Sequence, residues 1–164
     1  MNLWNLKNQR GIKMSSGFIF GNKILDVVFL SAFIAQAYKC ISPLITVGKF
    51  DFRRLFSTGG MPSSHSSSTV SLACSVGLVK GFSTTEFAIA TIFAIVTMYD
   101  ATGIRQEAGK HAKILNNLME GLPILNTHEF EELKEFLGHT GFEVLMGAIL
   151  GIVISFIMKG YLLS

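Results

Sequence analysis

Four long apolar stretches limit what this chain can fold into more than any other feature of its sequence. They cover about residues 24–47, 63–82, 87–103 and 142–163. A helix that crosses the hydrocarbon core of a bilayer needs about 20 predominantly apolar residues. The stretches therefore predict an all-α fold, an integral membrane helical bundle with about four transmembrane helices.

The composition favours a membrane protein over a soluble enzyme. Hydrophobic residues make up 49% of the chain and charged residues only 15%, whereas soluble domains carry about 25% charged residues. The net charge of +3 comes from scattered lysines and arginines. They do not form a basic stripe interleaved with aromatic residues, so we expect the bilayer, and no nucleic acid, as a partner.

The N-terminal flank permits two alternatives. Residues 35–37, Ala-Gln-Ala, have the small-x-small form of a signal-peptide cleavage site, and Met14 could be an alternative start. The apolar run continues to Val47, which favours an uncleaved helix. We therefore expect residues 1–21 to be an N-terminal extension and residues 22–164 to form one membrane domain.

The second apolar stretch differs from the others because it is rich in serine. Seven serines lie between positions 63 and 75, among small apolar residues. Small residues and hydroxyl groups are typical of helix contacts inside membranes, where two backbones approach closely. We expect this helix at the centre of the bundle.

The long polar segment, about residues 105–141, separates the third and fourth stretches. Within it, residues 127–137 place four apolar side chains at helical spacing and four glutamates on the other face. This pattern predicts a short amphipathic interfacial helix, at the membrane surface or against the bundle.

Four spans would bring most of the charged and titratable residues to one membrane face. The end of the first and third spans and the start of the second and fourth share that face. The residues concerned are Lys39, Lys49, Arg53, Arg54, His65, Asp100, Arg105, His111, His139 and Glu143. Ionisable residues in or beside membrane spans are functional candidates, so this clustering predicts a site there.

The segment 59–65, Gly-Gly-Met-Pro-Ser-Ser-His, suits the binding of phosphate. Its glycines permit a tight turn, and its proline suits the first turn of a helix. Ser63, Ser64 and His65 would then present backbone N–H groups and hydroxyls at the positive end of that helix. The alternative is a serine-capped helix start with an interfacial histidine.

Three motifs together resemble a known family. They are the segment 59–65, Tyr-Asp-Ala-Thr-Gly-Ile-Arg at 99–105 and Leu-Gly-His-Thr at 137–140. The combination resembles the divergent branch of the type 2 phosphatidic acid phosphatase family, whose superfamily includes vanadium-dependent haloperoxidases. The resemblance implies hydrolysis of a phosphomonoester or diphosphate without a metal or cofactor. One histidine attacks phosphorus, a second protonates the leaving oxygen, and lysine and arginine hold the phosphate.

The resemblance also implies roles for individual residues. His65 would be the general acid, with Ser63 and the Ser64 amide binding phosphate. The superfamily has glycine where Ser64 stands, which is tolerable only if this residue is helical. Lys39 would replace the lysine of the first superfamily motif, and Arg54, or the arginine before it, would supply the matching arginine.

The second histidine is either His111 or His139. His111 follows Arg105 at the superfamily spacing, but the aspartate expected four residues later is absent. On an unbroken helix Arg105 and His111 lie about 120° apart around the axis and about 9 Å along it, so a break near Gly109 would help them meet. His139 belongs to the third motif, and Glu143 follows it by four residues.

Two further residues complete the expected site. Asp100, which we count with the catalytic group, is expected to pair with a cation such as Arg105 or Lys39 and to orient phosphate. Arg105 itself is expected to bind phosphate.

We expect a lipid phosphatase, a phosphoric monoester or diphosphate hydrolase, in a bacterial cytoplasmic membrane. Its partner would be a phosphorylated lipid substrate, and a homo-oligomer is left open. The sequence does not choose among phosphatidic acid, phosphatidylglycerophosphate and a polyprenyl diphosphate, nor does it choose the membrane face of the site. The alternative is a non-catalytic membrane protein that retains a phosphate or phospholipid headgroup site.

Overall fold

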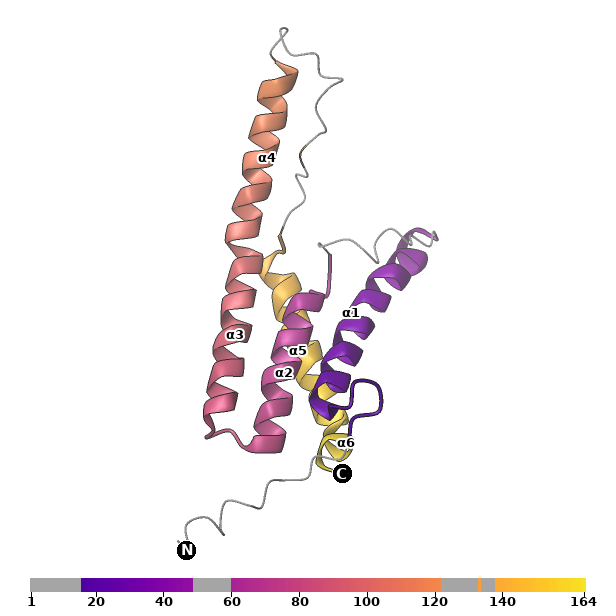
Figure 1. Cartoon of the computed structure of the whole chain (residues 1–164). Helices are drawn as coiled ribbons and strands as arrows, with labels where there is room; N and C mark the ends of the chain where they lie inside the picture. Colours follow the sequence, from indigo (N-terminus) through magenta and orange to yellow (C-terminus); the bar gives the residue numbers. More distant parts are fainter. Residues whose placement is uncertain (1–15, 49–59, 122–132, 134–137) are drawn as a thin grey trace, which may run out of the picture.

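The computed structural model describes residues 16–48, 60–121, 133 and 138–164, and all regular structure within these residues is helical. The helices are α1 (Lys23–Val47), α2 (Ser64–Lys80), α3 (Thr85–Thr102), α4 (Ile104–Glu120), α5 (Gly141–Ile157) and α6 (Lys159–Leu163). Four of them, α1, α2, α3 and α5, run along one another as a bundle (Figure 1). The helical membrane bundle expected from the sequence is confirmed. The amphipathic helix expected over residues 127–137 lies outside the described residues, apart from residue 133.

Helix α2 lies at the centre of the bundle, in contact with α1, α3 and α5. Its contact with α5 depends on two glycines. A Cβ atom on Gly147 would lie 2.3 Å from the carbonyl oxygen of Ser63, and one on Gly151 would lie 2.4 Å from that of Ser67. Backbone atoms cannot yield as a flexible side chain can, so only glycine permits this close approach.

Buried serines join α2 to the helices on either side. Ser155 of α5 donates to the carbonyl oxygen of Ser71 at 3.1 Å, and their hydroxyl oxygens lie 3.0 Å apart. The hydroxyl oxygens of Ser31 on α1 and Ser67 on α2 lie 2.6 Å apart. These contacts confirm the expected role of the serine-rich stretch as a helix-packing element.

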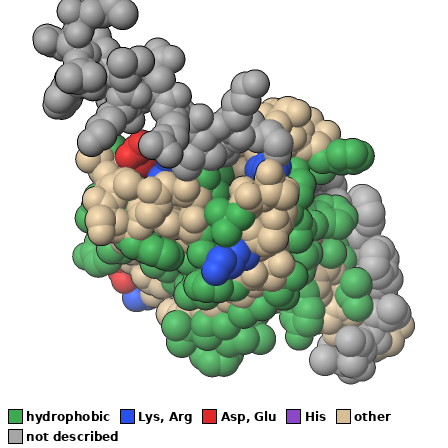
Figure 2. All heavy atoms as spheres, turned by 90° about the horizontal axis from the view of Figure 1, so that it is seen from below, with side chains coloured by type: hydrophobic (Ala, Val, Ile, Leu, Met, Phe, Trp, Pro, Cys, Tyr) green, Lys and Arg blue, Asp and Glu red, His purple; other side chains and the backbone are tan. Residues whose placement is uncertain are grey.

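The outward faces of the bundle are apolar. Side chains there that are more than half exposed include Phe29, Phe33, Ile89, Ile92, Val96, Leu145, Phe156 and Ile157. Seen from below, the end that carries α6 and the C-terminus has hydrophobic side chains around its rim and few charged ones (Figure 2). Large exposed apolar faces mark contact with other apolar material, and in a membrane protein that material is lipid.

Helix length agrees with this arrangement. Among the described residues, two segments are long and apolar enough to cross a membrane, Lys23–Ser42 and Thr85–Met119, and Gly141–Ile157 is a shorter apolar helix. The fourth expected span, about residues 142–163, is divided at Met158 into α5 and α6. The bundle therefore keeps the four expected apolar stretches, with one of them broken near its end.

Helices α3 and α4 follow each other almost in line, and α4 extends beyond the bundle (Figure 1). The break between them lies at Gly103, whose φ of −105° and ψ of −86° depart from helical values. The break considered near Gly109 is therefore wrong, because α4 runs from Ile104 to Glu120 without interruption.

A polar contact closes the end of the bundle that carries α6 and the C-terminus. The carboxylate of Asp26 on α1 accepts the backbone N–H groups of Phe18 and Phe20 at 2.6 Å and 2.9 Å. The Tyr161 hydroxyl of α6 also donates to this carboxylate. Asp26 thereby joins the segment before α1 to the last helix.

Candidate functional site

Three helix ends meet at the other end of the bundle. The N–H of Ser63, just before α2, donates to the carbonyl oxygen of Glu143 in the first turn of α5 at 3.0 Å. The N–H of His139, just before α5, donates to the carbonyl oxygen of Ala101 near the end of α3 at 2.9 Å. The structure therefore gathers the starts of α2 and α5 around the end of α3, as the topology of four spans predicts.

Two histidines face each other at this end. His65 is the second residue of α2, and His139 lies in the connection that leads into α5. Their ring centroids are 6.3 Å apart, with the ring planes at 81°. His65 is exposed, whereas His139 is 3% exposed and its Nε2 has no hydrogen-bond partner within the described residues.

Gly138 determines where His139 lies. Its φ is +89°, and a Cβ at this position would lie 2.7 Å from the backbone nitrogen of Gln106. Only glycine adopts this conformation readily and lets the loop approach the α3–α4 junction so closely. The glycine thus allows the bond between the His139 N–H and Ala101.

A capping box fixes the other side of His139. The Thr140 side chain accepts the N–H of Glu143 at 3.3 Å, and the Glu143 carboxylate accepts the N–H of Thr140 at 2.9 Å. Such reciprocal bonds satisfy backbone donors that a helix start leaves free. The backbone of His139 is therefore held between α3 and the first turn of α5.

Lys39 of α1 supplies a buried positive charge beside the histidines. It is 3% exposed, and its Nζ has no hydrogen-bond partner within the described residues. Its charge acts on both His65 and His139, and Glu143 is its acidic neighbour. Because a buried ammonium without an acceptor is costly, this position suits the binding of an anion.

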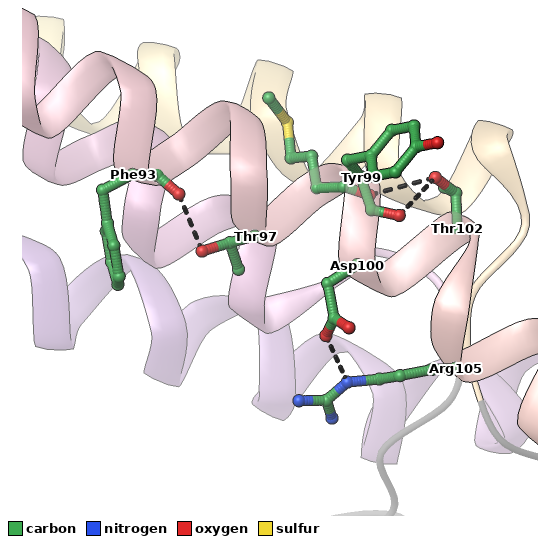
Figure 3. Close-up of polar contacts among 7 residues, drawn as sticks. Phe93, Thr97, Tyr99, Asp100, Thr102 and Arg105 are labelled. Carbon is green, nitrogen blue, oxygen red and sulfur yellow. Dashed lines mark hydrogen bonds and ion pairs between the residues drawn. The ribbon is translucent and has the colours of Figure 1, made fainter.

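Arg105 adds a second positive charge at the α3–α4 junction. Its Nε donates to the Asp100 carboxylate at 2.7 Å, across the break between the two helices (Figure 3). The pairing of Asp100 with a cation, expected from the sequence, is thus confirmed with Arg105 as the partner. Both residues lie close enough to act electrostatically on His65. The terminal nitrogens of the guanidinium are not used in this ion pair and can donate to a ligand.

The start of α2 presents two backbone donors to this site. The N–H groups of Ser63, Ser66 and Ser67 are engaged by Glu143 and Ser63. Those of Ser64 and His65 donate to no acceptor within the described part of the chain. Free N–H groups at a helix N-terminus suit anions.

The environment of His139 favours its neutral form. Burial lowers the pKa of the His139 imidazole, the Lys39 ammonium lowers it further, and the Glu143 carboxylate opposes this change. Since burial is the largest cause, the ring is mainly unprotonated at neutral pH and keeps a free nitrogen lone pair.

Other expected site residues lie elsewhere or have other contacts. His111 is an exposed residue of α4, and the charged neighbour on which it acts is Glu107. The structure does not bring His111 to the two facing histidines, and its catalytic role stays a sequence prediction. Arg54 and its neighbours Lys49 and Arg53 lie outside the described residues.

The serine motif is partly a helix cap. The buried Ser63 hydroxyl accepts the N–H of Ser66 at 3.3 Å and its hydroxyl at 3.1 Å. This is the contact expected of the serine-capped alternative. Ser64 is the first residue of α2, so the condition for replacing glycine at this position is met. Pro62 precedes the cap, so the expectation of proline in the first helical turn is wrong by two residues.

The sequence placed Glu143 among the charged residues of this membrane face without giving it a role, and it did not point to Gly138. Glu143 both caps α5 and acts on Lys39 and His139. Its spacing of four residues from His139, noted in the sequence, is the signal that links the two residues. Gly138 had no such signal, because its importance depends on contacts with a distant helix. Within the described residues no group of three or more histidines, cysteines or acids could hold a metal ion.

The sequence of this chain is similar to known sequences over most of its length. The sequence pattern described as "Divergent PAP2 family" matches residues 20–154. A Bacillus subtilis (strain 168) protein named "Uncharacterized membrane protein YuiD" is 38% identical, over 76% of this chain and 85% of that protein. No solved structure matches the chain.

The family match agrees with the motifs around the site. It includes the serine-histidine start of α2, the α3–α4 junction and the loop that carries His139. Together with the apolar outer faces of the bundle and the similarity to a named membrane protein, it shows that this chain is a membrane protein that belongs to the divergent PAP2 family.

Proposed function

We propose that this protein is a metal-independent membrane phosphatase that hydrolyses a lipid phosphate or diphosphate through a phosphohistidine intermediate. The observation that carries the proposal is the meeting of His65 and His139, 6.3 Å apart between ring centroids, beside the unpartnered ammonium of Lys39. A nucleophile, an acid and a cation thus surround one position where a phosphate can bind.

The first half of the reaction forms a phosphorus–nitrogen bond. Neutral His139 attacks phosphorus while the bond from phosphorus to the leaving oxygen breaks. His65, in its protonated form, gives its proton to that oxygen, so the product leaves as an alcohol, or as a monophosphate when the substrate is a diphosphate. The second half reverses the roles: neutral His65 takes a proton from water, the water oxygen attacks phosphorus, and phosphate leaves His139.

The cations and the helix start would hold the phosphate throughout. Lys39, the terminal nitrogens of Arg105 and the free N–H groups at the start of α2 are donors suited to its oxygens. Phosphoryl transfer depends mainly on such positioning and charge stabilisation, because the protein has little other covalent chemistry to do.

The two histidines suit different roles. His139 is buried, has a lowered pKa and is held on both sides by backbone bonds. These properties favour a nucleophile that must be unprotonated and well oriented. His65 is exposed and can exchange protons with water, as a general acid must after each cycle. His111 lies on α4 outside this histidine pair and is the natural control.

A lipid substrate fits the location of the site. The site lies at one end of a bundle whose outer faces are apolar. A phosphate on a lipid headgroup would reach that end without leaving the bilayer. We place the protein in a bacterial cytoplasmic membrane, since the similar membrane protein is from Bacillus subtilis.

The alternative is a headgroup-binding protein without catalysis. The unpartnered Lys39 and the free N–H groups of α2 support phosphate binding whether or not chemistry follows. In that case lipid phosphates would bind to the purified protein and remain intact.

A phosphate-release assay on a panel of lipid phosphates tests the proposal. Purified protein in detergent with EDTA should release phosphate, and vanadate should inhibit the reaction. His139→Ala and His65→Ala should each lose the activity, whereas His111→Ala should retain it. Full activity of His139→Ala would contradict the assigned nucleophile, and binding without any release would support the alternative.

A further inference from the structure

An apolar groove opens beside the site, between α1 and α5. Its volume is about 300 Å³, at the lower end of the range of about 300–1,000 Å³ for small-molecule sites. The side chains that line it include Ile34, Tyr38, Met61, Pro62, Met146 and Leu150. This volume is smaller than that of one turn of a helix about 10 Å across, but it suits part of a single flexible chain.

Three segments that line the groove lead directly to residues of the site or to the glycine that packs against them. Tyr38 lines the groove, and the next residue is the buried Lys39. Pro62 lines it too, directly before Ser63, the cap of α2. Met146 lines it from α5, next to the glycine that contacts the Ser63 carbonyl. One end of the groove therefore lies where the phosphate would bind.

The direction of the groove matches that of a lipid tail. Its α5 wall runs from Met146 to Val153, a rise of about 10 Å along the helix. The wall starts one turn inside the helix start that holds the site and continues toward the other end of the bundle. A chain in the groove would lie alongside the helices, with its polar end at the site.

We propose that the groove holds one hydrocarbon chain of the lipid whose phosphate binds between His65 and His139. This inference rests on the proposed phosphate site and narrows its substrate class to lipids with a long chain close to the phosphate. The groove then acts as a specificity element, because a water-soluble phosphate ester gains nothing from its apolar walls.

A groove-filling variant tests the inference. The full chain in detergent micelles is assayed on dioleoyl phosphatidic acid and on its water-soluble dibutyryl analogue. Met146→Trp places a large ring in the groove, and it should lower kcat/KM on the dioleoyl substrate about tenfold, mainly through KM, while kcat/KM on the analogue changes less than about threefold. Ile152→Trp is the matched control, since Ile152 is an exposed residue of α5 outside the groove lining, and it should leave both substrates unchanged. Equal losses on the two substrates, or no loss on either, would overturn the inference.

A second measurement separates this inference from the phosphatase itself. Phosphatidic acid with a diazirine on one acyl chain is incorporated in phosphatidylcholine nanodiscs with the protein and illuminated. The label should attach mainly to residues 34–38 and 146–153 and should be displaced by unlabelled phosphatidic acid. That result supports the groove even if no hydrolysis is seen. Labelling that is uniform over the outer faces, including Ile92 and Val96 of α3, overturns it.

Discussion

Lys39 combines two properties that rarely occur together in a membrane helix, burial and the lack of a hydrogen-bond acceptor within the described residues. Its neighbours include both histidines and Glu143. In such surroundings the lysine both attracts an anion and disfavours a second positive charge on His139.

Replacing this lysine should alter both the binding of phosphate and the pH dependence of kcat/KM. Lys39→Met should lower kcat/KM about 100-fold through loss of a phosphate donor. The nucleophile must be neutral, and the pKa of His139 is lowered by burial first and by Lys39 second. The acid limb of the wild-type profile should therefore lie below about pH 6.5. Without the lysine charge the limb should move to higher pH.

The pH profile of kcat/KM checks this expectation. Lys39→Arg keeps the positive charge and serves as the control, so its acid limb should stay near that of the wild type. A limb of Lys39→Met that stays in place or moves to lower pH would show that Lys39 does not act on the catalytic histidine.

Gly138 shows how one residue can determine the geometry of a site. With a φ of +89° and no room for a Cβ beside Gln106, alanine there forces the loop away from the α3–α4 junction. Gly138→Ala should lower the free energy of unfolding by about 1–3 kcal/mol and should reduce phosphate release more than stability alone explains, because His139 moves. Thermal unfolding in detergent and the phosphatase assay measure the two effects.

A glycine nearby gives the matched control. Gly141 has an ordinary φ, and a Cβ there would meet nothing within 4 Å. Gly141→Ala should therefore leave both measurements close to those of the wild type. Equal effects of the two substitutions would mean that the conformation of Gly138 is not what places His139.

At the scale of elements, the contact between α2 and α5 determines the distance between the two histidines. Each histidine lies at the start of one of these helices. The glycines of α5 allow the backbones to approach, and the serines of both helices bond across the contact. A substitution in the middle of this contact should therefore change the distance between the two histidines at its end.

Gly151→Ala should destabilise the bundle. A Cβ at this position would lie 2.4 Å from the Ser67 carbonyl oxygen, so α5 must shift away from α2. We expect the free energy of unfolding to fall by about 1–3 kcal/mol, together with phosphatase activity. Gly160→Ala on α6, where a Cβ meets nothing within 4 Å, is the control. Unchanged stability of Gly151→Ala in a detergent unfolding titration would contradict the close approach.

The sequence predicted the helices better than it predicted the breaks within them and the side-chain contacts between them. Apolar stretches and serine content were sufficient to predict the four spans and the central place of α2. Helices in lipid require apolar residues, and close helix contacts in a membrane are enriched in small and hydroxyl residues. The end of the third stretch at about residue 103 agrees with the break at Gly103, whereas the break considered near Gly109 is absent, since a glycine in a helical pattern is compatible with a bend or with a continuous helix. Arg105 and His111 matched a known spacing, yet the structure pairs Arg105 with Asp100 and leaves His111 outside the histidine pair.

At the scale of the whole molecule, apolar side chains and the polar residues of the candidate site lie on different parts of the bundle. Apolar side chains cover the outer faces, while the histidines, Lys39, Asp100 and Arg105 lie at one end. The start of α1 and the C-terminus lie at the other end (Figure 1). Topology alone thus brings residues from four helices together, which explains why the cluster could be located from the sequence, although among its contacts the sequence predicted only the pairing of Asp100 with a cation such as Arg105.

This separation predicts the sidedness of the protein in a membrane. Helix α2 has 17 residues and is about 25 Å long, slightly less than a hydrocarbon core of about 30 Å, but its neighbours force it to cross with them. Lys110 on α4 and Lys159 near the C-terminus are exposed at opposite ends of the molecule. In sealed vesicles a membrane-impermeant thiol reagent should therefore label Lys110→Cys and Lys159→Cys from opposite sides, in a background where Cys40 and Cys74 are alanine. Labelling of both from the same side would show that the bundle does not cross the bilayer as four spans, and the site could then not lie at the membrane face opposite the C-terminus.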